Sequence, residues 1–444
     1  MRMRCKDAWT VPLALHLGFA FLIALVPVPA RSVPSFARQL DMPCNGCHVQ
    51  FPVLNTFGRQ FKLSGYTLSS KPTIEDERAE ARRKLLDLPI PALLSVMFQA
   101  DYTRTGKRQP DSKNDDIEFP DQASLFFAGR IAPKVGSFVQ VTYSGADNEF
   151  GFDNTDIRIA DTKEIDSKPL VYGVSFNNNP TVSDPWNTTA AWGYPYASSP
   201  SAPTPAASAL VNGNLAQEVA GATVYGYFDE LVYAEVGVYG AAPLGIDRPL
   251  ARAGSLQGPI PYWRLALSHV FGQTSVMVGH FGLAAKQKPD GGGPNDDFED
   301  VGLDFQIRHP LGPGLFQLQG RWVYEDARYG TGNASNRHGH LHQISADATY
   351  FWDQWASFTL SPFATFGSRD RVVYPPDPVD GSRNGRPDSH GLIAEVSYNP
   401  WMNTRLTLQY TSYFEFNGRR AGYDGSDRDA SDNNTLFLQM WLAW

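Results

Sequence analysis

The stretch Leu315-Phe-Gln-Leu-Gln-Gly-Arg-Trp-Val-Tyr-Glu325 decides the fold, because its side chains alternate between polar and apolar. One face of an extended strand carries Gln317, Gln319, Arg321 and Glu325, and the other carries Phe316, Leu318, Trp322 and Tyr324. Residues 303–309 and 344–350 repeat this alternation. Such strands of about ten residues, with large aromatics near their ends, are typical of a transmembrane β-barrel, apolar toward lipid and polar toward the lumen.

The connections between these strands favour a barrel over a soluble β-sandwich, which would alternate too. Short links alternate with long polar segments, as in outer-membrane barrels, where the turns lie on one side and the loops on the other. We expect residues 89–444 to form an antiparallel barrel of about 16 strands. The short links are 132–136, 272–273, 310–314 and 400–403, and the long ones are 105–121, 177–217, 288–298, 329–340, 371–389 and 419–433.

The final strand supports this prediction, since the chain ends on an aromatic residue. One face of this strand carries Leu436, Leu438, Met440, Leu442 and Trp444. A terminal strand of this form resembles the recognition signal of outer-membrane barrel assembly. An ordinary amphipathic strand explains the alternation but not the ending.

The composition fits the same class. Aromatic residues make up 13% and charged residues only 19% of the chain. After residue 30, no apolar run approaches the roughly 18 residues of a spanning helix. The net charge of −8 argues against nucleic acid and favours cationic partners.

Residues 1–30 resemble an export signal. Arg2, Arg4 and Lys6 precede an apolar run from Val11 to Val28, and Val28-Pro29-Ala30 offers a cleavage site. The alternative is an N-terminal membrane anchor, and export follows from either.

The pentapeptide Cys44-Asn-Gly-Cys-His48 follows in the mature chain. Two thiols three residues apart, followed by histidine, form the attachment pattern of c-type haem. The thiols add to the two vinyl groups of the porphyrin, and the histidine binds the iron. A redox dithiol would need a βαβ context, and a zinc site would need two more ligands. We therefore predict one covalent haem held by Cys44, Cys47 and His48.

Residues 31–88 are expected to form a small α-helical haem segment. Leu54, Phe57 and Phe61 recur at helical spacing, and Gly65 is a plausible helix stop. The charged stretch from Ile74 to Asp87 is predicted to be a solvated linker helix. A segment of this size has little core of its own and needs the haem, the barrel or both.

The second axial ligand of the haem iron is less clear in the sequence. Met97 lies in phase with the lumen-facing residues of the first strand, and methionine opposite histidine raises the reduction potential. We therefore take Met97 as the candidate ligand, with Met277 second. Four histidines fall on the apolar phase or at strand ends (His269, His280, His309, His342), and three fall in loop-like stretches (His338, His340, His390). Met97 lining the lumen alone, or ligation by a loop histidine, remain alternatives.

Three acidic stretches, at 111–116, 295–300 and 424–429, would attract a divalent cation. Solvated loops of a porin are often acidic as well. The long segment 177–217 could fold into the lumen as a constriction or lie outside it.

Two regions resemble the fused outer-membrane monohaem cytochrome–porins, a family that includes surface iron oxidases of iron-oxidising bacteria. The first region runs from Phe36 to Tyr66, and the second contains Phe416-Asn-Gly, Tyr423-Asp-Gly and residues 430–436. The resemblance implies thioethers at Cys44 and Cys47 and a proximal ligand at His48. It also implies that the haem segment lies in the lumen or at its periplasmic mouth, and that extracellular Fe(II) donates electrons.

The expected function is therefore electron transfer in the outer membrane, from extracellular Fe(II) through one haem c to a periplasmic cytochrome or similar acceptor. Whether the protein is an iron oxidase in the enzymatic sense is left open. Two alternatives remain: a solute porin with a haem plug or redox gate, and electron export to an extracellular acceptor. The predicted organisation is a signal peptide (1–30), the haem segment with its linker (31–88) and the porin-like barrel (89–444).

Overall fold

The computed structural model describes residues 33–70, 73–75, 87–89, 93–110, 114–241, 255–289 and 293–444. The predicted signal peptide and most of the predicted linker lie outside these ranges. No helix among the described residues is long and apolar enough to cross a membrane.

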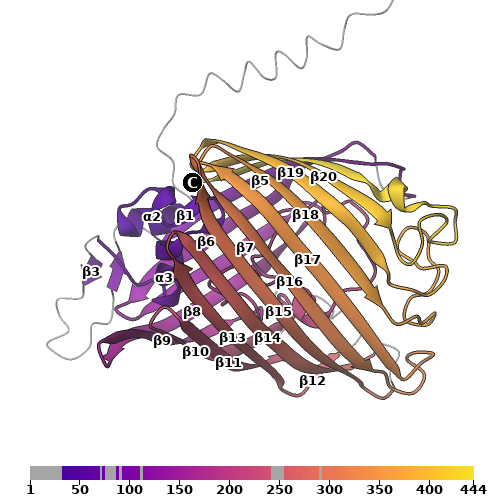
Figure 1. The fold of residues 1–444 in the computed structure, drawn as a ribbon, viewed down its shortest axis with the longest axis horizontal. Coiled ribbons are helices and arrows are strands. Elements are labelled where there is room, and N and C mark those ends of the chain that lie inside the picture. The colour runs from indigo at the N-terminus through magenta and orange to yellow at the C-terminus, as the bar shows by residue number, and fades with distance from the viewer. Residues whose placement is uncertain are drawn as a thin grey trace, which may run out of the picture.

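Sixteen antiparallel strands close into a barrel, which confirms the predicted fold class (Figure 1). The last strand pairs with the first, so that the sheet has no free edge and the sandwich alternative is excluded. One of the sixteen is interrupted at Gly258-Pro259, and its two parts carry separate labels, β12 and β13. The barrel strands are β5 Leu94–Thr105, β6 Asp116–Ala132, β7 Val135–Ser144, β8 Glu149–Ile165, β9 Lys168–Asn177, β10 Val219–Phe228, β11 Val232–Ala241, β12 Ser255–Gln257, β13 Ile260–Phe271, β14 Thr274–Lys288, β15 Asp296–Leu311, β16 Gly314–Arg328, β17 His338–Trp352, β18 Ala356–Gly367, β19 Ser389–Trp401, β20 Thr404–Glu415 and β21 Thr435–Ala443.

The polar and apolar residues that alternate in the sequence face the lumen and the lipid, respectively. On β15, Asp304 and Gln306 are buried inside, whereas Leu303 is half exposed outside. Aromatic side chains are exposed near both ends of the strands, as in the aromatic girdles of membrane barrels. Examples are Phe271, Trp352, Tyr398 and Trp444 at one end, and Phe119, Phe150, Phe366 and Phe414 at the other. A closed barrel with this outer surface belongs in the outer membrane.

Short and long connections lie at opposite ends of the barrel, here named the turn end and the loop end (Figure 1). The turn between β8 and β9 contains only Asp166 and Ser167, both with positive φ, as the tightest hairpins require. Histidines 338, 340 and 390, predicted to be in loops, instead belong to the loop-end portions of β17 and β19. Strands β17 and β19 extend further toward the loop end than the polar composition of these stretches indicated.

The N-terminal residues 33–70, here named the plug segment, contain two helices and two very short strands. These are α2 Pro34–Leu40, the 3-10 turn η2 Cys44–Gly46, β1 His48–Gln50, β2 Val53–Leu54 and α3 Thr56–Leu63. Asn55 caps α3 by accepting the Gly58 N–H at 2.9 Å, and the helix ends just before Gly65, which has φ +67°. Gly65 therefore ends the helix as predicted, whereas Phe57 is exposed and Leu54 precedes the helix.

The predicted linker helix is wrong at the two ends of the charged stretch, which form short strands instead. Ile74 lies in β3 (Thr73–Glu75) and Asp87 in β4 (Asp87–Pro89), and these strands pair antiparallel. Residues 76–86 lie outside the described ranges. The charge pattern indicated solvent exposure but could not reveal pairing between the ends of the stretch.

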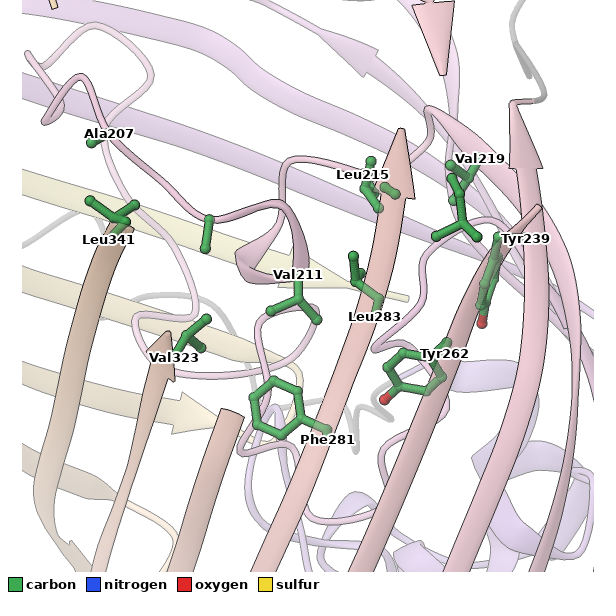
Figure 2. Packing of buried hydrophobic residues seen from close by; sticks show 13 residues of the cluster. Ala207, Val211, Leu215, Val219, Tyr239, Tyr262, Phe281, Leu283, Val323 and Leu341 are labelled. Carbon is green, nitrogen blue, oxygen red and sulfur yellow. The ribbon is translucent and has the colours of Figure 1, made fainter. Parts of the chain in front are cut away.

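The long connection between β9 and β10 folds into the lumen, which answers the question that the sequence left open. We call residues 178–218 the lumen loop. Its apolar side chains, among them Val211 and Leu215, pack on the inner faces of strands that carry Tyr262, Phe281 and Leu283 (Figure 2). The lumen thus contains the plug segment toward the turn end and the lumen loop toward the loop end.

Candidate functional site

The plug segment is fixed at the turn end by hydrogen bonds to the barrel. Gln50 donates to the carbonyl oxygens of Asp353 and Ala356 in the β17–β18 hairpin, at 3.1 and 2.6 Å. Arg308 and Arg405 point inward from the wall and donate to the carbonyl oxygens of Leu54 and Phe51. Figure 1 accordingly places α2, β1 and α3 at one end of the barrel and the long loops at the other.

The two cysteines and the histidine of the pentapeptide line one cavity. This cavity has a volume of about 310 Å³ and lies between the plug segment, the barrel wall and the lumen loop. Cys44 and Cys47 are not joined by a disulfide. The 3-10 turn that contains Cys44 reverses the chain, so that both thiols and the imidazole of His48 reach the same space.

Helix α3 packs directly on the pentapeptide. A side chain at Gly58 would place its Cβ 2.2 Å from the carbonyl oxygen of Cys47, so only glycine allows this approach. Asn55 adds two hydrogen bonds, from its amide nitrogen to the carbonyl oxygens of Asn45 and Gly46, at 3.1 and 3.0 Å. The motif is thereby held by the helix that follows it.

The imidazole of His48 is oriented by the backbone. Its Nδ1 lies 3.0 Å from the carbonyl oxygen of Pro52, and only an N–H can satisfy that acceptor. The tautomer thus fixed leaves the lone pair on Nε2, the arrangement found in metal-binding histidines. Burial lowers the pKa of His48 to about 4, and burial followed by the neighbouring Cys44 raises the pKa of Cys47 to about 11. The imidazole is therefore neutral.

Met97, the candidate second ligand, lines the same cavity and is buried. The Nε2 of Gln99 lies 3.4 Å from its sulfur, and Gln439 in turn donates to Gln99 at 2.9 Å. Met277 is buried in a separate cluster with Trp186 and Tyr227, away from the cavity. Of the eight histidines among the described residues, His48 alone lines the cavity.

The rest of the wall combines nine aromatic side chains with aliphatic residues and a few polar ones, among them Gln140 and Asp153. Phe36 stacks on Tyr66 with ring centroids 5.1 Å apart, Phe138 meets Trp192 edge-on at 5.5 Å, and Phe51 meets Trp441 at 4.8 Å. A mostly apolar cavity with two thiols that are not in a disulfide, an oriented imidazole and a thioether has the donor set that a c-type haem can use. The residues present therefore fit the predicted group.

The lumen loop covers the cavity on the side of the loop end. Asn187, Trp192 and Tyr196 contribute to the lining, and the indole N–H of Trp192 donates to the carbonyl oxygen of Val182 at 2.8 Å. These residues could not be predicted from the sequence, because they lie about 140 positions after the cysteines and reach the cavity only through the inward course of the loop.

Other lining residues were also missed, among them Met42 and Lys62. The Met42 side chain lies 2.6 Å from where a Cβ on Gly46 would be, and Lys62 belongs to α3. The Lys62 position was predictable in part, since it lies one residue after Phe61 on the predicted helix. Its role in the lining, however, depends on the barrel wall around it.

The predicted acidic loops do not converge on a cation site within the described residues, where no group of three His, Cys, Asp or Glu side chains gathers. Asp424 accepts hydrogen bonds from the backbone N–H groups of Ser426 and Arg428 in its own loop and of Val379 in the neighbouring loop between β18 and β19. Residues 111–113 of the first acidic stretch lie outside the described ranges.

No protein-family model and no curated protein matches the sequence. Among solved structures, the chain is similar to the anion-selective porin from Comamonas acidovorans, with 11% identity, a TM-score of 0.48, and coverage of 79% of this chain and 98% of the porin. It is also similar to the outer membrane channel DcaP of Acinetobacter baumannii, with 12% identity, a TM-score of 0.46, and coverage of 84% and 100%. The OmpF protein of Salmonella typhi has 14% identity, a TM-score of 0.44, and coverage of 79% and 97%.

Proposed function

We propose that this outer-membrane barrel is a monohaem electron-transfer protein. Extracellular Fe(II) gives one electron to a haem c in the cavity of the plug segment, and the electron passes on to a periplasmic cytochrome or similar acceptor at the turn end. The observation that carries this proposal is the convergence of Cys44, Cys47, His48 and Met97 on one aromatic cavity inside the barrel.

The bound haem would supply a one-electron ferric/ferrous couple. The residues of this chain would attach the haem covalently, coordinate its iron and exclude water from it. Cys44 and Cys47 would form the thioether bonds, and the Nε2 of His48, kept neutral and oriented by Pro52, would bind the iron. Met97 would supply a thioether ligand to the iron, and a methionine paired with a histidine raises the reduction potential, so that a mild reductant could reduce the haem.

The two ends of the barrel would have different partners. The plug segment lies at the turn end, which faces the periplasm in outer-membrane barrels, so a soluble acceptor can approach it there. From the loop end, the lumen loop separates the cavity from the outside. Electrons from iron would therefore enter by way of the loop residues that line the cavity, among them Trp192 and Tyr196.

Oxidation of Fe(II) by purified holoprotein tests the proposal. The variant Cys47→Ala, which removes one thioether, is the matched comparison. We expect Fe(III) formation coupled to reduction of an added c-type cytochrome in the wild type and a large loss in the variant. Equal rates in the two proteins would refute the proposal.

A redox titration distinguishes uptake of electrons from their export. A clearly positive midpoint potential supports Fe(II) as donor, and a strongly negative one supports an extracellular acceptor instead. The solute-porin alternative remains, and the lumen loop and the plug segment, which both lie in the lumen, would narrow its channel. A liposome-swelling assay with small sugars tests this alternative. Free permeability of the wild-type barrel would support the solute porin.

A further inference from the structure

Lys62 is a buried lysine in the wall of the cavity. It lies on α3 (Thr56–Leu63), is only 6% exposed and lines the same space as Cys44, Cys47 and His48. Its ammonium group donates to one oxygen, the backbone carbonyl of Asp184 at 2.7 Å, and stands 5.5 Å from the ring centroid of Trp192. An ammonium group has three N–H donors.

The carboxylates near Lys62 are committed to other partners. Asp156 accepts from the guanidinium of Arg158 at 2.7 Å and from the hydroxyl of Tyr66 at 2.8 Å. The carboxylate of Asp184 pairs with Arg264 at 3.1 Å and accepts from the backbone N–H groups of residues 186, 188 and 189. Among the described residues, Lys62 forms no ion pair.

Glu235, the third carboxylate near Lys62, also accepts hydrogen bonds from other groups. It accepts from the hydroxyls of Ser183 and Tyr233, at 2.6 and 2.8 Å. A buried charge without a counter-ion is costly, and such groups normally have an ionic partner. Because these three carboxylates already have other partners, the partner of Lys62 is expected to be an anion that occupies the cavity.

We infer that Lys62 is the binding residue for an anionic carboxylate of the cavity ligand, and that this carboxylate is a haem propionate. This inference rests on the proposed function, since it needs haem in the cavity. Lys62 is also the only lysine or arginine among the described residues that line the cavity. A porphyrin attached by its vinyl groups still carries two propionates, and one of them would form an ion pair with Lys62.

The pair would have two consequences for this chain. The ammonium group would hold one propionate at a fixed position beside α3. It would also keep a positive charge close to the haem, which favours the ferrous state and raises the midpoint potential. Trp192, whose ring lies against the ammonium, would shield the pair from water entering at the loop end.

The test compares purified holoproteins carrying Lys62→Met, Lys62→Arg and Lys134→Met. Lys134 is a matched control, because it lies in the β6–β7 turn with 60% of its side chain exposed and pairs with Asp161. Covalent haem is quantified from absorbance and mass, the midpoint potential by titration, and the propionate bending band by resonance Raman spectroscopy. The wild type is also measured in H₂O and D₂O.

We expect Lys62→Met to retain covalent haem, to titrate at a lower midpoint potential and to have a shifted propionate band. Lys62→Arg should restore most of both properties, and Lys134→Met should resemble the wild type. The wild-type band should shift in D₂O, because the propionate accepts an exchangeable N–H; this measurement holds even if Lys62→Met fails to fold.

An unchanged potential and propionate band in haem-loaded Lys62→Met would overturn the inference while leaving the proposed function intact. A wild-type propionate band that is insensitive to D₂O would overturn it as well. Purified wild type without covalent haem would instead overturn the proposed function itself.

Discussion

Met97 has the most direct influence on the reduction potential in this account. Its thioether lies in the cavity wall, next to Gln99. Replacing Met97 with alanine should lower the midpoint potential on the order of 100 mV, within the roughly 0.8 V that axial ligands span. Potentiometric titration measures this shift, and loss of the weak long-wavelength band of methionine-ligated ferric haem should accompany it.

Met277→Ala is the matched control for this prediction, since Met277 is equally buried but lies in another cluster. Its potential should match the wild type. If Met97→Ala leaves the potential and the spectrum unchanged, Met97 only lines the cavity, and the other axial position is filled by something else.

Gly58 is a second residue of the site that can be tested, because an added Cβ atom would displace α3 or the haem motif. A Cβ there would lie 2.2 Å from the carbonyl oxygen of Cys47. We expect Gly58→Val to displace α3 or the haem motif, to reduce the yield of covalent haem and to destabilise the protein by about 1–3 kcal/mol. Haem staining of purified protein, together with thermal unfolding in detergent, measures both effects.

Gly151→Ala provides the comparison, because nothing lies within 4 Å of the position that its Cβ would occupy. It should leave haem content and stability at the wild-type level. Normal haem loading in Gly58→Val would show that α3 does not position the pentapeptide.

At the scale of elements, buried ion pairs hold the lumen loop against the wall. The guanidinium of Arg264, on β13, lies 3.1 Å from Asp184 of the loop and 2.7 Å from Asp304 of β15, and none of the three is accessible. Arg264→Met would leave two carboxylates buried without their cation. Removal of one member of a buried pair costs about 3–5 kcal/mol, which urea unfolding in detergent micelles would detect.

An exposed pair on the same sheet gives the control. Lys286 lies 3.2 Å from Asp297, with side chains 63% and 46% exposed. Lys286→Met should change the stability by less than about 1 kcal/mol, as is usual for surface pairs. Comparable losses in the two variants would mean that Arg264 does not anchor the loop.

The lumen loop should also set the permeability of the barrel. Deleting residues 180–216 removes the segment whose side chains occupy the lumen at the loop end. We expect the deletion variant to admit small sugars in a liposome-swelling assay that the wild type resists. Deleting residues 331–336, in the connection between β16 and β17, should leave permeability unchanged, and a freely permeable wild type would contradict the expectation.

At the scale of the whole molecule, the barrel was predictable because its determinants are local. Alternation such as that of residues 303–309 sets the lipid and lumen faces, and the length of each connection sets the end of the barrel at which it lies. The spacing of Cys44, Cys47 and His48 is equally local. Each of these features is visible within some ten residues of sequence.

The rest of the site depends on long-range contacts. Trp192 and Lys62 meet only because the lumen loop turns inward and α3 enters from the other end, and no periodicity encodes either path. Met97 was a candidate from strand phase, and the structure brings it to the cavity; its bond to iron stays a prediction. The predicted linker helix was wrong at its ends, since charge pattern does not reveal strand pairing.

The central claim is that one haem is covalently bound to Cys44 and Cys47 inside a membrane barrel. Intact mass and visible spectra of the protein purified from outer membranes test it most directly. The account predicts the mass of the processed chain plus one haem and the sharp reduced bands of a c-type cytochrome, both lost in Cys44→Ala/Cys47→Ala. A colourless barrel with the mass of the polypeptide alone would contradict it.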